Sequence, residues 1–138
     1  MSLKNTVSLY LLTLAIFFLV DMLWLGLAAK DFYRRQLGGM LRPTVIWPAA
    51  ILFYLLFVAG LLLFIIVPAL DPRAGALQAL WRGAFFGLVT YATYDLTNLA
   101  TLRGWPLAVT AVDLAWGAVL GGAVSFLAAL AGARLFKG

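Results

Sequence analysis

Three aspartates stand inside the apolar stretches of this chain, and their carboxyl groups are the side chains best suited to chemistry. They are Asp21, Asp95 and Asp113, and none has an adjacent charged residue. An acidic residue within a membrane span costs roughly 2.5–3.5 kcal/mol on insertion scales, so it is retained for a reason. Such a group can bind a cation, hold a proton, act in an acid–base pair or tie helices together. These three residues are therefore the centre of the candidate site.

Aromatic residues with polar tips accompany the aspartates. From residue 83 to 101, glycine, tyrosine, aspartate and asparagine recur at three- and four-residue steps, which places them on one helical face. Trp47 and Trp105 are better explained as interfacial belt residues. The predicted ligand-binding set consists of Asp21, Trp24, Tyr54, Tyr91, Tyr94, Asp95, Asn98, Asp113 and Trp116.

The elements that must position these residues are four apolar segments, each close to the ~20 residues that a helix needs to cross a bilayer. They cover about residues 6–29, 46–67, 79–101 and 107–131. The sequence therefore predicts an all-α integral membrane protein, a four-transmembrane-helix bundle forming a single domain over residues 1–138. Because the connection after residue 101 is very short, the third and fourth helices should be antiparallel neighbours.

The depth of each aspartate follows from the rise of 1.5 Å per helical residue. Four spans put both termini on one side, here called the terminal side, and the first and third connections on the other, called the odd-loop side. Asp21 and Asp95 lie past the middle of their helices, whereas Asp113 lies early in a helix of opposite direction. All three should therefore meet in the odd-loop half.

Composition supports a membrane setting, because 65% of the 138 residues are hydrophobic and only 11% are charged. Soluble domains carry about 25% charged residues. The net charge of +5 comes from basic residues at the termini and in connections, which argues against nucleic acid. The absence of Cys and His argues against disulfides, haem and a conventional zinc site, so no metal and no cofactor are expected.

The positive-inside rule does not orient the chain, because each side carries the same number of basic residues. The terminal side has Lys4, Arg73, Arg82, Arg134 and Lys137, and the odd-loop side has Lys30, Arg34, Arg35, Arg42 and Arg103. A dual topology stays open.

The sequence also contains two glycine pairs and one short motif that occurs twice. Gly83/Gly87 and Gly117/Gly121 are GxxxG motifs, which permit close helix contact. They could pack helices within the chain or dock it into a homo-oligomer or a larger membrane complex. Residues 20–24 and 112–116 share the pattern V-D-x-x-W, which is too short to establish a repeat.

One stretch is distinctive as a whole: residues 91–101 read YATYDLTNLAT, followed by Trp105-Pro106 and by DLAWG at 113–117. With DMLWLG at 21–26 and Phe53-Tyr54, it resembles a family of small bacterial membrane proteins catalogued as domain of unknown function 2177. The resemblance covers nearly the whole chain. It implies a multi-pass protein of the bacterial cytoplasmic (inner) membrane and assigns no activity and no catalytic residues.

Three functions remain in competition. The first is binding or transport of a lipid or small molecule, with an anionic headgroup near Arg34, Arg35 or Arg103. The second is an enzyme acting on a lipid, with Asp95 and either Asp113 or Asp21 as an acid–base pair, although no catalytic motif supports it. The third is an accessory subunit of a larger complex. We favour the first and expect membrane lipids as partners.

Overall fold

The computed structural model describes residues 1–136, and every regular element in that range is helical. The elements are α1 (Leu3–Leu23), η1 (Trp24–Ala28), α2 (Lys30–Leu37), η2 (Gly38–Met40), α3 (Trp47–Leu61), η3 (Leu62–Ile66), α4 (Val67–Ala69), α5 (Gly75–Thr101) and α6 (Leu107–Leu135). Segments η1 and η3 are π-helical and continue α1 and α3. Lys137 and Gly138, expected on the terminal side, lie outside the described residues.

Three helical stretches are long and apolar enough to cross a membrane: Leu3–Ala28, Trp47–Ala69 and Leu107–Leu135. With 27 residues, α5 is long enough as well, but it is not among them. The polar residues of the candidate site, together with Arg82, make α5 less apolar than the others. The all-helical membrane architecture is thus confirmed, with three stretches that qualify as spans by length and composition.

The first connection contains a helix where the sequence predicted only a linker. Helix α2 begins after a break at Ala29, whose backbone departs from helical values at φ −111° and ψ −5°. Its charged residues are exposed, whereas Phe32, Tyr33 and Leu37 are half-buried. The helix is therefore amphipathic, and packing of this apolar side holds it against the bundle.

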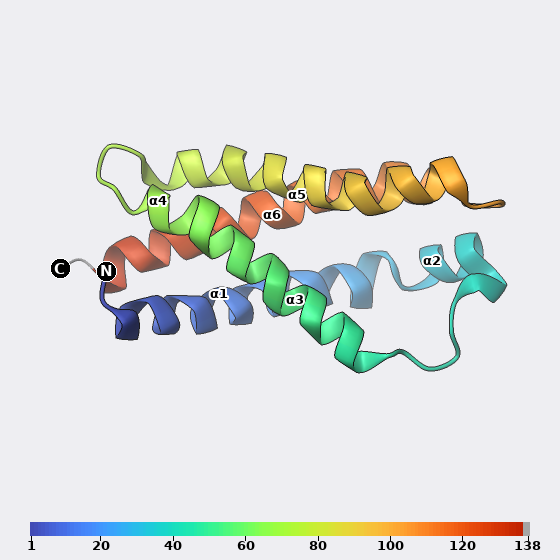
Figure 1. Ribbon diagram of the computed structural model, residues 1–138, viewed down its shortest axis with the longest axis horizontal. Helices are drawn as coiled ribbons and strands as arrows, with labels where there is room; N and C mark the ends of the chain where they lie inside the picture. The colour runs from blue at the N-terminus through green and yellow to red at the C-terminus, as the bar shows by residue number, and fades with distance from the viewer. Residues whose placement is uncertain (137–138) are drawn as a thin grey trace.

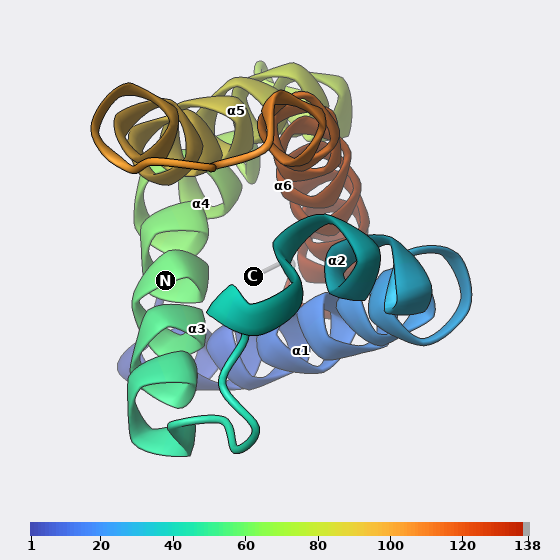
Figure 2. The same ribbon diagram turned by 90° about the vertical axis from the view of Figure 1, so that its right-hand side faces the viewer.

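Helices α5 and α6 run antiparallel along almost their whole length, and α1 packs on α6 (Figure 1). Helix α3 crosses obliquely: its η3–α4 end lies against α5, and its Trp47 end lies away from α5. Seen from the odd-loop end, α1, α3, α5 and α6 surround a centre over which α2 lies (Figure 2). The beginning of α1 and the end of α6 lie at the same end of the molecule.

The α5–α6 contact is closed by glycine. A Cβ at Gly87 would collide with the carbonyl group of Gly117, and one at Gly83 would collide with the carbonyl oxygen of Gly121. Both GxxxG motifs are therefore used inside the chain, face to face. Association with other chains through these glycines stays a prediction, and it would have to coexist with this contact.

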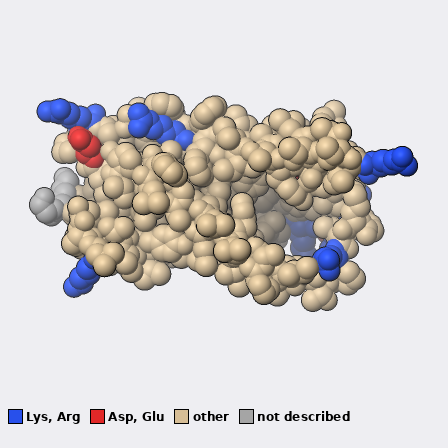
Figure 3. All heavy atoms as spheres, viewed as in Figure 1, with Lys and Arg blue, Asp and Glu red and all other residues tan. Residues whose placement is uncertain are grey.

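The apolar core fills the terminal half and the middle of the bundle. Its largest fully buried side chains include Phe17, Leu9, Leu61, Ile66 and Leu120. Many long apolar side chains instead face outward, as expected for a surface solvated by lipid. In Figure 3 basic side chains gather towards the two ends of the molecule and leave most of the middle uncharged.

Candidate functional site

A cleft of about 240 Å³ opens in the odd-loop half, between α1, α3, α5 and α6. We call it the acidic cleft; it is lined by Asp21, Trp24, Leu25, Tyr33, Ala50, Phe53, Tyr54, Tyr91, Asp113 and Trp116. A second hollow of about 300 Å³ adjoins it and shares Phe53, Tyr91 and Asp113. The space exists because α3 diverges from α5 towards its Trp47 end.

The cleft opens sideways rather than only towards one end. Figure 3 shows the molecule hollowed on the face between α3 and α5, towards the α2 end, with basic side chains visible at that end. None of those basic side chains is among the residues that line the cleft. Arg34, Arg35 and Arg103 are exposed. The interior of the cleft therefore presents acidic, aromatic and apolar groups.

The two V-D-x-x-W segments meet across the cleft. The indole rings of Trp24 and Trp116 stack with centroids 4.6 Å apart and an interplanar angle of 9°. Asp21 lies beside Trp116 of the other segment, and Asp113 is linked to Trp24 through Tyr33. Because α1 and α6 are antiparallel, each aspartate faces the tryptophan of the other segment.

Tyr33 is the polar residue of the cleft that the sequence did not predict; Leu25, Ala50 and Phe53 are further lining residues outside the predicted set. Its hydroxyl donates a hydrogen bond of 2.5 Å to Asp113 Oδ1, and Trp24 Nε1 donates one of 3.4 Å to the Tyr33 oxygen. Burial and the neighbouring Asp113 carboxyl group raise the pKa of Tyr33 above its ordinary value, so the hydroxyl stays a donor. The aromatic pair Phe32-Tyr33 between charged residues was the available signal for an amphipathic helix.

Asp95 is fully buried and lies behind the acidic cleft rather than on its wall. Its carboxyl group is close enough to that of Asp113 to interact with it, yet neither oxygen has a hydrogen-bond partner within the described residues. Two carboxylates can bond to each other only when one is protonated. The backbone carbonyl of Asp95 accepts a hydrogen bond of 3.4 Å from the Thr110 hydroxyl.

The remaining two candidates lie towards the loop. Tyr94 lines the adjoining hollow and is 58% exposed, with its ring edge-on to that of Trp105 at 5.6 Å. Asn98 lies one turn farther along α5 and lines neither hollow. Of the nine predicted residues, the structure therefore gathers six around the acidic cleft: Asp21, Trp24, Tyr54, Tyr91, Asp113 and Trp116.

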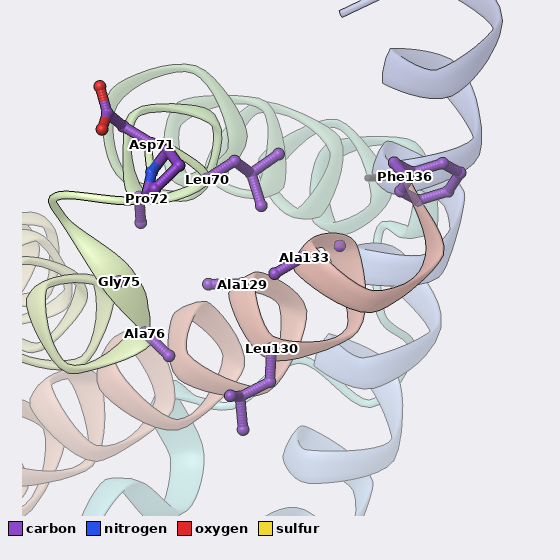
Figure 4. Close-up of a pocket in the computed structure, with 11 residues that line it drawn as sticks. Leu70, Asp71, Pro72, Gly75, Ala76, Ala129, Leu130, Ala133 and Phe136 are labelled. Carbon is purple, nitrogen blue, oxygen red and sulfur yellow. The ribbon is translucent and has the colours of Figure 1, made fainter. Parts of the chain in front are cut away.

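A larger cavity, of about 510 Å³, lies at the terminal end but carries little chemistry. It is bounded by the α4–α5 connection and the last turns of α6 (Figure 4). The carboxyl group of Asp71 points away from it in Figure 4 and accepts a bond from the Arg73 amide at 2.8 Å. The other side chains of this cavity that Figure 4 labels are apolar or belong to proline, so Asp71 is the charged side chain among the described lining residues.

The acidic cleft does not have the geometry of a metal centre. Within the described residues no three acidic, histidine or cysteine side chains converge as metal ligands would. Its chemistry is that of carboxylates beside flat aromatic faces, suited to binding and to proton exchange.

A family model described as "Predicted membrane protein (DUF2177)" matches residues 6–130. No curated protein matches the chain. No solved structure matches it either.

Proposed function

The chain belongs to the DUF2177 family of predicted membrane proteins, and we propose that it binds a lipid or another small amphiphilic molecule in the acidic cleft. The observation that carries the proposal is the cleft itself, which combines two carboxyl groups with an aromatic wall. Ligand sites are commonly concave and apolar, with a few converging polar groups. A polar group bound inside would leave its tail along the adjoining hollow, which Phe53 of α3 and Thr90, Tyr91 and Tyr94 of α5 line.

The proposal includes a fourth span, formed by α5. Helix α5 is antiparallel to α6 and packs along almost its whole length, so a membrane that contains α6 would surround α5 as well. Its Asp95 is fully buried, as an acidic residue in a span should be. Helical spans belong to the bacterial cytoplasmic membrane, since outer-membrane proteins span as barrels. We therefore place the chain there as a multi-pass protein.

Cysteine labelling tests the fourth span, because the chain contains no cysteine of its own. Ser2→Cys on the terminal side and Arg103→Cys in the α5–α6 connection are both exposed. In vesicles with one orientation, an impermeant maleimide should label one of them from outside and the other only after permeabilisation. Labelling of both from the same face would contradict a spanning α5.

Binding is favoured over catalysis because of where Asp95 lies. An acid–base pair of Asp95 with Asp113 would need both groups in reach of the substrate, yet Asp95 is fully buried and absent from the cleft wall. The accessory-subunit alternative relied on the GxxxG faces, which already contact each other. Neither alternative has an observation of comparable weight.

Filling the cleft tests the binding proposal. Ala50 lies on its wall in α3, so Ala50→Trp should occupy the space without removing a carboxyl group. Ala118→Trp, in a shallow apolar groove on the α5–α6 face, is the matched control. Native mass spectrometry of protein released from lipid nanodiscs should detect bound lipid or added amphiphile on wild type and Ala118→Trp, and lose it on Ala50→Trp. Equal retention by all three would refute binding in the cleft.

A further inference from the structure

The charge of the acidic cleft has one sign. Asp21 and Asp113 line it, Asp95 lies directly behind Asp113, and no lysine or arginine is among its lining residues. Potentials in a low-dielectric cleft lined by one sign of charge favour ligands of the opposite sign. This differs from the anionic headgroup expected from the basic connections.

Asp21 provides the second observation. Asp21 is only 5% exposed and lines the cleft, and the indole of Trp116 is the donor beside its carboxyl group. That contact falls short of full hydrogen-bond geometry, because Trp116 Nε1 has no partner within the described residues. Asp71, by contrast, is exposed and accepts a hydrogen bond from a backbone amide. A buried carboxylate that no basic side chain accompanies is costly unless a cation joins it.

The aromatic residues of the cleft wall indicate which class of cation it would bind. The stacked indoles of Trp24 and Trp116, with Tyr54, Tyr91 and Phe53, surround the carboxyl groups with ring surface. Aromatic faces attract organic ammonium groups, and quaternary ammonium ligands are bound in such cages. A bare metal ion would instead need several oxygen ligands in close convergence, which the described residues do not provide.

We propose that the acidic cleft selects an organic ammonium group, and that its ligand is a cationic amphiphile whose tail extends between α3 and α5. This inference rests on the proposed function and names its ligand class. Asp21 and Asp113 supply the charge, and the aromatic residues of the wall, among them Tyr54, Tyr91 and Phe53, supply the ring surface. The apolar hollow that adjoins the cleft, lined by Phe53 and Thr90 among others, accommodates the first part of the tail.

A competition experiment tests the sign of the charge. Radiolabelled dodecyltrimethylammonium is bound to the protein in nanodiscs of neutral lipid and counted above protein-free nanodiscs. Dodecylamine should displace it at concentrations at least about tenfold lower than dodecyl sulfate or dodecanol, as expected for loss of one charged contact. Tetramethylammonium, which has no tail, should compete weakly; competition as strong as that of dodecylamine would support a water-soluble cation as the ligand and overturn the amphiphile.

Variants separate this inference from the proposed function. Asp21→Asn should weaken binding of the ammonium probe by about tenfold or more. Asp113→Asn should have the same effect, and it replaces Asp21→Asn in the experiment where that variant is less stable than wild type. Asp71→Asn is the matched control and should bind as wild type does. Equal affinity for cationic, neutral and anionic amphiphiles, blocked by Ala50→Trp, would overturn the charge selection and leave the proposed function intact. No saturable binding of any amphiphile would overturn both.

Discussion

The two sides of α5 differ in how closely they pack against the neighbouring helices. Towards α6 its glycines bring the backbones into contact, and a Cβ at Gly87 has no room. Towards α3 the helices diverge, and Thr90, Tyr91 and Tyr94 of α5 line the hollow between them. Without a hydrophobic driving force between helices in lipid, close packing of small residues holds one side together. The rigid glycine contact with α6 thus allows the side of α5 that faces α3 to stay open.

The largest expected effect is a break in the closed side. Gly87→Ala places a methyl group against the Gly117 carbonyl, so the helices must separate. We expect a loss of roughly 3 kcal/mol in the free energy of unfolding, at the upper end of overpacking. Gly26→Ala, which meets nothing within 4 Å, is the control and should be neutral or slightly stabilising. Reversible unfolding in mixed detergent micelles measures both, and equal stabilities would contradict a closed α5–α6 contact.

The second effect, of intermediate size, compares a tyrosine hydrogen bond in each half of the bundle. Tyr33 donates to a carboxyl group of the acidic cleft, whereas Tyr10 donates to the backbone carbonyl of Leu55 at 2.9 Å in the terminal half. Tyr33→Phe should cost about 1.5–3 kcal/mol, and Tyr10→Phe about 0.5–1.5 kcal/mol. The same unfolding assay applies. When Asp113→Asn is already present, the loss at Tyr33 should fall to that of a neutral hydrogen bond, about 0.5–1.5 kcal/mol. Persistence of the full loss would mean that the charge of Asp113 is not its source.

The smallest effect concerns a hydroxyl on the closed side. Ser125 is fully buried against Gly83, and its oxygen has no partner in the described residues. Ser125→Ala should therefore be neutral or stabilise by up to about 1 kcal/mol. Thr110, in the first turn of α6, accepts a hydrogen bond from Trp105 Nε1 at 3.0 Å. Thr110→Val should cost about 1 kcal/mol, and destabilisation by Ser125→Ala to a similar extent would remove the contrast.

Much of this arrangement follows from patterns that are local in the sequence. The length of the apolar segments predicts helices that span a membrane. The rise per residue predicts that Asp21 and Asp113 lie at the same depth, and in the structure both line the acidic cleft. The family was recognised from short motifs such as YATYDLTNLAT and is confirmed by the match over residues 6–130. These features depend on single segments or on simple counting.

The rest depends on how segments meet. The tilt of α3, which creates the cleft, is set by tertiary packing and has no marker in its nearly uniform apolar sequence. The docking of α2 could not be predicted, because a segment of eight residues rich in charge is also typical of a linker. Its contact with the bundle depends on the hydrogen bond from Tyr33 to Asp113, which is distant in the sequence. The GxxxG motifs predict close contact but not with which partner, and only the structure pairs them with each other.

The stacked indoles of Trp24 and Trp116 have an optical consequence. Two nearly parallel rings 4.6 Å apart are close enough for their electronic transitions to couple, which should give a paired circular-dichroism signal in the far ultraviolet. One ring belongs to the end of the first helical stretch and the other to α6. The stacked pair therefore provides a label-free optical probe of the contact between these two helices.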